Sequence, residues 1–144
     1  MKATWWNDAI KHLSKNDKTL KKIINKHNKG YLQSRGNPFI ALCRTIIGQQ
    51  ISVKAASSIF NKFQSKVKTV SHKNILKLNI EEIKSCGLSY KKSEYIMYLA
   101  QYFATHPNAI KSWKKMDDEL VIQELCKLNG IGPWSAEMFL MFCL

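Results

Sequence analysis

The sequence predicts an all-α fold. Apolar residues recur at three- and four-residue intervals over most of the chain, and residues that favour helix N-caps stand just before several of these stretches. No alternating apolar and polar run of useful length is present. With 144 residues, of which 45% are hydrophobic, the chain is long enough to build one globular core. We therefore expect residues 1–144 to form a single helical domain.

The N-terminal part predicts two amphipathic helices. In residues 5–13 the apolar side chains fall on one face, which predicts that Trp5 and Trp6 belong to the core. Asp17 is a favourable N-cap for a second helix over residues 18–27. In that helix we expect the apolar side chains to point inward and the lysines outward. Residues 31–36 are predicted to form a loop.

The middle of the chain contains the most apolar predicted helix. Asn37 and Pro38 favour a helix start, and the following residues are apolar on most sides until Gly48, which predicts a central helix. Residues 49–51 form an exposed connection to Ser52, the expected N-cap of the next helix. Short helices are predicted over residues 72–78 and 80–85, followed by a turn at residues 86–89 and a helix over residues 90–104.

The C-terminal part predicts a helix-hairpin-helix at about residues 118–143. A helix over residues 117–127 leads to a turn with two glycines, Gly130 and Gly132, and Pro133 opens the last helix, over residues 133–144. The glycines permit dihedral angles closed to other residues and expose backbone amides at a positive helix end, where phosphate binds. The alternative is a capped helix connection with a structural role only. A weaker second hairpin is predicted where Lys91 and Lys92 follow the turn at Gly87; the alternative for both lysines is an ordinary solvated surface.

The charge favours a polyanionic partner. The chain has 23 Lys and Arg against 10 Asp and Glu, a formal net charge of +13, and residues 1–72 hold 14 of these bases but only 2 of the acids. We expect the N-terminal half to supply most of the electrostatic attraction. The alternative is that the lysines only form a solvated face.

Other features of the composition argue against a side-chain metal site, a membrane-spanning segment and secretion. The four cysteines are widely spaced and predict reduced core thiols, and the histidines are scattered, so we expect no side-chain metal site and no cofactor. The N-terminus does not have the order of a secretory signal, and no apolar run is long enough to span a membrane. We expect a cytoplasmic protein that does not bind membranes. The cysteines are Cys43, Cys86, Cys126 and Cys143.

Three motifs in order resemble the 3-methyladenine DNA glycosylase II family of helix-hairpin-helix glycosylases. They are Asn37-Pro38-Phe39 with Ile46-Ile47-Gly48-Gln49-Gln50-Ile51-Ser52-Val53-Lys54-Ala55-Ala56, then Gly87-Leu88-Ser89 with Lys91-Lys92 and Tyr95-Ile96, and then Leu128-Asn129-Gly130-Ile131-Gly132-Pro133-Trp134-Ser135-Ala136. The resemblance extends from about residue 5 to the end of the chain. Asn129 stands where the family commonly has proline, which is a mild departure.

The resemblance implies removal of alkylated bases from double-stranded DNA by a monomeric enzyme that flips the base into a pocket. It implies that Gln50 is the wedge that fills the vacated space and that Trp134 lines the base pocket. The alternatives are a solvent-exposed amide at Gln50 and a core tryptophan packed under the turn at Trp134. The two glycine-containing turns themselves predict that Gly130, Gly132, Lys91 and Lys92 bind DNA phosphates.

The resemblance further implies a monofunctional reaction, because Trp134 stands where related glycosylase-lyases have a Schiff-base lysine. It places the catalytic aspartate beyond Leu144, so we expect no catalytic residue within the chain and an incomplete C-terminus. A monovalent cation could bind the carbonyls of Cys126, Leu128 and Ile131. Two alternatives remain open: a non-catalytic helix-hairpin-helix DNA-binding module and a basic helical protein-interaction adaptor.

Overall fold

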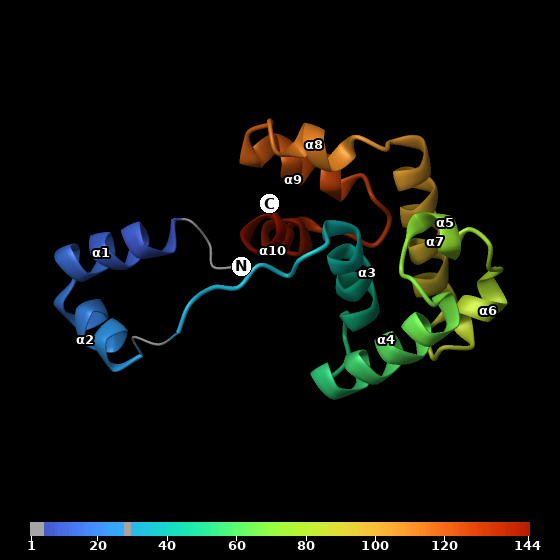
Figure 1. Ribbon diagram of the computed structural model, residues 1–144, viewed down its shortest axis with the longest axis horizontal. Coiled ribbons are helices and arrows are strands. Elements are labelled where there is room, and N and C mark those ends of the chain that lie inside the picture. Colours follow the sequence, from blue (N-terminus) through green and yellow to red (C-terminus); the bar gives the residue numbers. More distant parts are fainter. Residues whose placement is uncertain (1–4, 28–29) are drawn as a thin grey trace. The chain divides into compact units, whose positions relative to one another are not determined.

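The computed structural model describes residues 5–27 and 30–144, and its regular elements within these ranges are helices (Figure 1). The all-α prediction is confirmed. Contacts between residues divide the chain into two compact units, Met1–Gly36 and Asn37–Leu144. The single domain expected from the sequence stays a prediction.

The first unit contains helices α1 (Trp6–Asn16) and α2 (Lys18–Lys26), which contact each other. Asp17 separates them. Its carboxylate accepts hydrogen bonds from the backbone N–H of Thr19 at 2.7 Å and of Leu20 at 2.9 Å. These bonds pair two of the N–H groups that a helix start leaves without partners, so the prediction of Asp17 as N-cap is confirmed.

The prediction that Trp5 and Trp6 are core residues is wrong. The side chain of Trp5 is 50% exposed, Trp6 is half-buried, and neither α1 nor α2 contains a buried residue. Ile23, expected to point inward, is 51% exposed. The physical reason is that two short helices cover each other along one side only, so their apolar faces lack a further layer within this unit.

The second unit is built around α3 (Pro38–Gly48), which contacts α4 (Val53–Val67), α7 (Tyr90–Thr105) and α10 (Pro133–Cys143) (Figure 1). Six of the 11 residues of α3 are buried, which confirms the prediction of a central helix. The Asn37 side chain accepts a hydrogen bond from the N–H of Ile40, and Pro38 occupies the first turn, where a missing N–H costs nothing.

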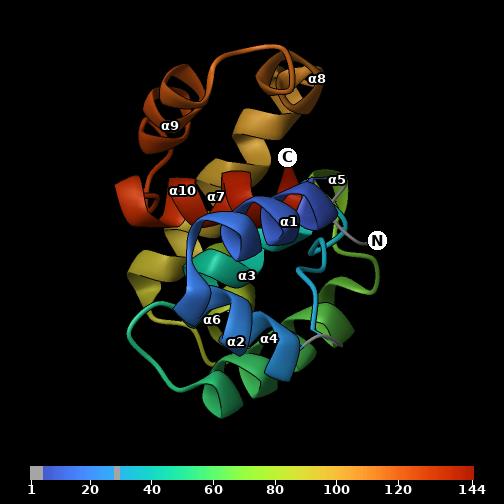
Figure 2. The same ribbon diagram turned by 90° about the vertical axis from the view of Figure 1, so that its left-hand side faces the viewer.

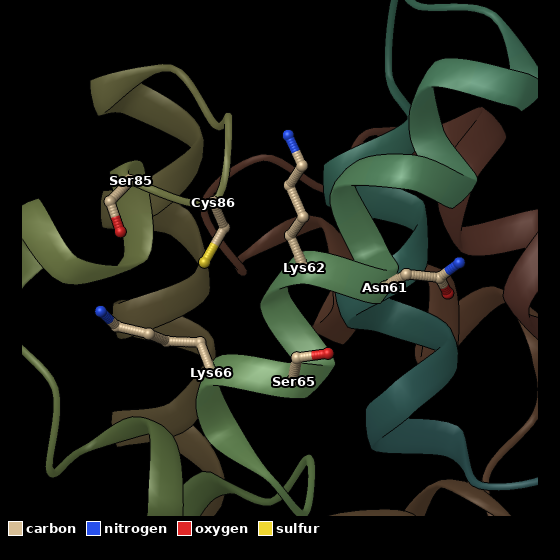
Figure 3. A pocket seen from close by; sticks show the side chains of 6 residues that line it. All are labelled: Asn61, Lys62, Ser65, Lys66, Ser85 and Cys86. Atoms are coloured by element: carbon tan, nitrogen blue, oxygen red, sulfur yellow. The ribbon is translucent and has the colours of Figure 1, made fainter.

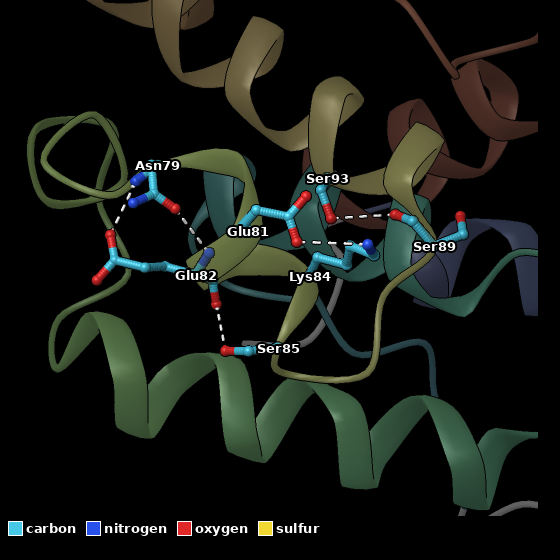
Figure 4. A network of polar contacts seen from close by, with 7 residues as sticks. All are labelled: Asn79, Glu81, Glu82, Lys84, Ser85, Ser89 and Ser93. Carbon is cyan, nitrogen blue, oxygen red and sulfur yellow. Dashed lines mark hydrogen bonds and ion pairs between the residues drawn. The ribbon is translucent and has the colours of Figure 1, made fainter.

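The remaining helices of the second unit are short: α5 (His72–Ile75), α6 (Ile80–Lys84), α8 (Ala109–Trp113) and α9 (Asp118–Cys126). Side-chain caps define where α6 and α7 begin, and Figure 4 shows the cap of α6. Asn79 accepts from the N–H of Glu82 at 2.9 Å while the Glu82 carboxylate accepts from the N–H of Asn79 at 2.9 Å, a reciprocal capping box. The hydroxyl of Ser89 caps α7 by accepting from the N–H of Lys92.

A chain of edge-to-face aromatic contacts joins four helices in the core of this unit. The ring centroids of Phe39 and Phe103 are 5.1 Å apart, those of Phe103 and Trp113 are 6.0 Å apart, and those of Trp113 and Phe139 are 5.9 Å apart. This is the geometry that aromatic quadrupoles favour. It connects α3, α7, α8 and α10, and thereby supports the helix that follows the hairpin turn.

The cysteines differ in burial. Cys43 and Cys86 are buried as predicted, but Cys126 is exposed and Cys143 is partly exposed, so the prediction of four core thiols is wrong. The buried positions of α9 are Val121 and Leu125, and the residue after Leu125 lies about 100° further around the helix. That rotation turns Cys126 towards solvent. Among the described residues, no helix has the length and apolar character needed to cross a membrane.

Candidate nucleic-acid interface

The helix-hairpin-helix lies where it was predicted. Helices α9 and α10 span residues 118–143 and contact each other on either side of the turn (Figure 2). Leu128 and Ile131 are buried in the turn, and the N–H of Ile131 donates to the carbonyl of Leu128 at 3.0 Å. Local hydrogen bonds and two buried apolar side chains therefore fix the shape of the hairpin.

Gly130 is required by the fold for two reasons. Its φ of +84° lies in the left-handed region that L side chains rarely adopt. A Cβ built on it would also lie 2.3 Å from Cδ2 of Tyr95, far closer than atoms in contact. The Tyr95 ring thus packs directly against the backbone of the turn, and glycine is the residue that permits both features.

Gly132 differs from Gly130, and the prediction that the turn needs a glycine at both positions for its dihedral angles is wrong. Gly132 has φ −102° and ψ 176°, an extended conformation open to any residue. A Cβ placed on it would meet no atom within 4 Å. The fold of the chain therefore places no restriction on this position, and a side chain there would enter open space in front of α10.

The N-terminus of α10 presents free backbone donors. Gly132 is its N-cap and no side chain caps it, unlike the starts of α4 and α7. Gly132 and Pro133 are exposed. Because the first N–H groups of a helix lack internal partners and carry the positive end of the helix dipole, this end is suited to bind an anionic group.

Trp134 is in the first turn of α10 and its side chain is 70% exposed. The alternative of a core tryptophan packed under the turn is therefore excluded. The neighbouring Ser135 and Ala136 are buried and anchor the helix instead. An exposed indole beside an uncapped helix start places an aromatic face next to the anion-binding end.

Gln50 lies on the connection between α3 and α4, is exposed, and has φ +58°. Such a backbone conformation is uncommon for a residue other than glycine and costs about 1–2 kcal/mol. The preceding residue, Gln49, reaches across to the hairpin, where its Nε2 donates to the carbonyl of Gly130 at 2.6 Å. The structure thus brings the connection that carries Gln50 next to the hairpin turn. The role of Gln49 was not predicted, because nothing in the local sequence indicates a partner 81 residues away.

The two lysines at the start of α7 have different surroundings. Lys91 is exposed, whereas Lys92 is half-buried and its ammonium donates to the carbonyls of Ile47 and Gln49, each at 2.8 Å. Burial lowers the pKa of Lys92. The solvated-lysine alternative therefore does not hold for Lys92, whose charge is held against the end of α3. The turn that precedes α7 contains Gly87 with φ +102°, as a second hairpin-like turn requires.

An open groove of about 490 Å³ lies between α4 and the turn that joins α6 to α7 (Figure 3). Figure 3 shows Lys62 and Lys66 extending from α4, with Cys86 between the two side chains in this view. Burial raises the pKa of the Cys86 thiol, and the charge of Lys66 offsets this only in part. The groove therefore places cationic side chains beside a buried thiol. The six lining residues are Asn61, Lys62, Ser65, Lys66, Ser85 and Cys86.

The carbonyls expected to hold a monovalent cation lie around the hairpin turn. That of Leu128 already accepts the hydrogen bond from Ile131 and retains one lone pair. A cation on the carbonyls of Cys126, Leu128 and Ile131 stays a prediction.

Comparison with known proteins connects this geometry to DNA repair. Residues 43–139 match the family described as HhH-GPD superfamily base excision DNA repair protein. A curated DNA-3-methyladenine glycosylase from Saccharomyces cerevisiae is 36% identical over 156 residues, which cover 94% of this chain and 52% of that protein. DNA-3-methyladenine glycosylase 1 from Schizosaccharomyces pombe is 29% identical over 138 residues, which cover 92% of this chain and 60% of that protein. The chain thus spans between about half and two thirds of the length of these relatives.

Solved structures of DNA glycosylases have a similar fold. The Schizosaccharomyces pombe 3-methyladenine DNA glycosylase in complex with abasic DNA superposes with a TM-score of 0.76 at 26% identity, over 95% of this chain and 70% of that one. The DNA-3-methyladenine glycosidase of Bacillus halodurans gives a TM-score of 0.74 at 31% identity, over 78% of this chain and 52% of that one. With the hairpin, the exposed indole and the matched motifs in place, the chain belongs to the HhH-GPD superfamily of base excision DNA repair proteins, and its relatives are DNA-3-methyladenine glycosylases.

Proposed function

We propose that this chain carries the DNA-binding and base-recognition machinery of a monofunctional DNA glycosylase that removes alkylated bases from duplex DNA. The observation that carries the proposal is the hydrogen bond from Gln49 to the carbonyl of Gly130, because it holds the connection bearing Gln50 beside the hairpin turn. A phosphate-binding helix end, an exposed aromatic face and a protruding amide are thereby gathered in one region of the second unit. The names of the relatives and the abasic DNA bound by the Schizosaccharomyces pombe glycosylase support the same assignment.

Each group has a distinct task in this proposal. The open space at Gly132 lets a DNA phosphate approach the free amides of α10 without meeting a side chain. Trp134 stacks against the extruded base, and its π face attracts a cationic alkylpurine by about 0.5–2 kcal/mol. Gln50 enters the stack in place of that base and hydrogen-bonds the orphaned partner base. Unpairing a damaged base costs less than unpairing a normal one, which favours damaged sites.

The reaction is hydrolysis without a covalent enzyme intermediate. Water adds to the anomeric carbon of the sugar and releases one proton to the solvent, while the bond to the base nitrogen breaks and a cationic alkylated base leaves as a neutral molecule with that electron pair. Tryptophan has no amine with which to attack the sugar, so Trp134 cannot form the Schiff base of a lyase. The expected products are free base and an intact strand with an abasic site.

Binding to two duplexes tests the proposal. One duplex is intact and the other carries an abasic site in the same sequence. We expect tighter binding to the abasic duplex, and for each duplex log K that falls with log salt by about 0.9 per phosphate contacted. Gln50→Ala should weaken binding to the abasic duplex and leave the intact duplex almost unchanged. Gly132→Ala should weaken binding to both duplexes alike, since phosphate contacts carry no base preference. Salt-independent binding would exclude DNA and favour the protein-interaction adaptor.

Base release from methylated duplex DNA tests the glycosylase assignment itself, with the protein assayed as its gene encodes it. Free 3-methyladenine without strand cleavage is expected. A covalent product trapped by borohydride would contradict the monofunctional mechanism. Tight binding to abasic DNA without base release would favour the non-catalytic DNA-binding module.

A further inference from the structure

Lys92 lies at the junction between the connection that bears Gln50 and the rest of the second unit. Its ammonium donates to the carbonyls of Ile47 and Gln49 at 2.8 Å each, across 45 and 43 residues of sequence. These carbonyls belong to the end of α3, where a helix leaves its last carbonyls without N–H partners and its dipole favours a cation. The backbone of Lys92 is itself held, because its N–H donates to the capping hydroxyl of Ser89.

Two further contacts link the hairpin turn to the end of α3 and to α7. Gln49 donates from its side chain to the carbonyl of Gly130, and the ring of Tyr95 packs against the backbone of Gly130. Lys92 and Tyr95 are three residues apart on α7 and therefore share one face of that helix. One face of α7 thus holds both the end of α3 and the hairpin turn, and Gln49 joins these two to each other.

The Lys92 bonds also bear on the backbone of Gln50. The carbonyl of Gln49 belongs to the peptide unit that precedes Gln50, so the ammonium fixes the orientation of that peptide plane. Gln50 has φ +58°, a value that a glutamine leaves unless its surroundings hold it. Without the bond, the peptide can rotate and Gln50 can relax to a negative φ.

We propose that Lys92 is a positioning residue that holds the backbone of Gln50 in its position beside the hairpin turn, rather than a DNA phosphate contact. Two of the three N–H donors of its ammonium are already used inside the protein. Lys91, one residue earlier and exposed, is the lysine of this turn that remains open to a phosphate. The inference rests on the proposed DNA-binding function for its binding readout.

The test compares Lys92→Met with the matched control Lys91→Met, each of which retains much of the aliphatic chain and loses the charge. Affinity for intact and abasic duplexes is measured over a salt series. For Lys92→Met we expect the preference for the abasic duplex to fall about tenfold, with the salt slope unchanged. For Lys91→Met we expect the slope to fall by about 0.9 with the preference retained. Lys92→Arg, which can restore donors to both carbonyls, should recover part of the preference.

A Lys92→Met protein that loses about 0.9 from the slope and weakens on both duplexes alike would overturn the proposal, because it would make Lys92 a phosphate contact. So would an unchanged abasic preference. Amide hydrogen exchange of residues 48–52, measured without DNA, is a second readout: it should accelerate in Lys92→Met and Gln49→Ala while α4 stays protected. If the unaltered chain does not prefer abasic DNA, the proposed function fails. The role of Lys92 is then judged by hydrogen exchange alone, and unchanged exchange at residues 48–52 in Lys92→Met would overturn it. If Lys92→Met does not fold, Lys92→Gln, which also removes the ammonium, carries the same comparison.

Discussion

Replacing Gly130 by alanine should destabilise the second unit strongly, while the same change at Gly132 should not. At Gly130 the alanine must adopt φ +84°, which costs about 1–2 kcal/mol. Its Cβ would also lie 2.3 Å from Cδ2 of Tyr95, and overpacking of this kind costs about 1–3 kcal/mol. Together these terms predict a loss of about 2–5 kcal/mol in the free energy of unfolding, a large part of the stability of a natural domain.

Gly132→Ala is the matched control two residues away. Its backbone is extended and its Cβ would meet no atom within 4 Å. We expect the free energy of unfolding to stay within about 0.5 kcal/mol, or to rise by about 0.4–1 kcal/mol because alanine restricts the unfolded chain. The measurement is urea unfolding, monitored by circular dichroism at about 222 nm. The dependence of the free energy of unfolding on urea concentration is compared between the variants to check two-state behaviour.

The steric part of the Gly130 effect can be isolated with Tyr95→Ala. In the Gly130→Ala, Tyr95→Ala double variant the overlap is gone but the positive φ remains. In a double-mutant cycle, Gly130→Ala should therefore cost about 1–3 kcal/mol less in the Tyr95→Ala background than in the unaltered protein. Equal stability losses for Gly130→Ala and Gly132→Ala, or a coupling near zero, would refute the assignment of Gly130 to a position restricted by Tyr95.

Three further outcomes are expected. Asn79→Ala should lower the free energy of unfolding by about 1 kcal/mol in the same urea assay, since it removes one half of the capping box, and Asn79→Asp should retain most of it; an Asn79→Ala protein as stable as the parent would contradict this. Lys68 has φ +64° and ψ −71° in a tight turn, in which the N–H of Thr69 donates to the carbonyl of Val67. Because glycine adopts this conformation without strain, Lys68→Gly should raise the free energy of unfolding by about 1 kcal/mol. The control Lys73→Gly, within α5, should lower it. Among the thiols, Cys126 should react with an aromatic disulfide reagent without unfolding, whereas Cys43, whose pKa burial raises, should react at the rate of unfolding; equal rates would mean that the burial pattern is wrong.

Helix positions in this chain could be predicted because their causes are local. A cap residue and the apolar spacing that follows it lie within one or two turns, as at Asp17, Asn37 and Ser52, each of which caps the helix expected of it. The hairpin and its family motifs are also contiguous stretches. The position of Gln50 on an exposed connection followed from the same local pattern, whereas the exposure of Trp134 did not; the roles of both residues in DNA binding stay predictions.

Burial depends on what packs against a residue, and no local pattern supplies that information. The apolar stripe at Trp5 and Trp6 predicts a buried face, yet a two-helix unit has no layer to cover it. Cys126 follows a buried leucine in sequence but lies around the helix from it, on the solvent side. Apolar spacing identifies a face, and the fold decides whether that face is covered.

The sequence by itself determined the helical class, the hairpin at residues 118–143 and membership of a DNA repair family, since these depend on short-range periodicity and contiguous motifs. The tertiary structure alone separated Gly130, which the ring of Tyr95 restricts, from Gly132, which nothing in the chain restricts. It also moved Lys92 from the surface to the end of α3 and gave Gln49 a partner in the hairpin. The physical reason is that these contacts join residues tens of positions apart, and such pairs meet only after the helices have packed around α3.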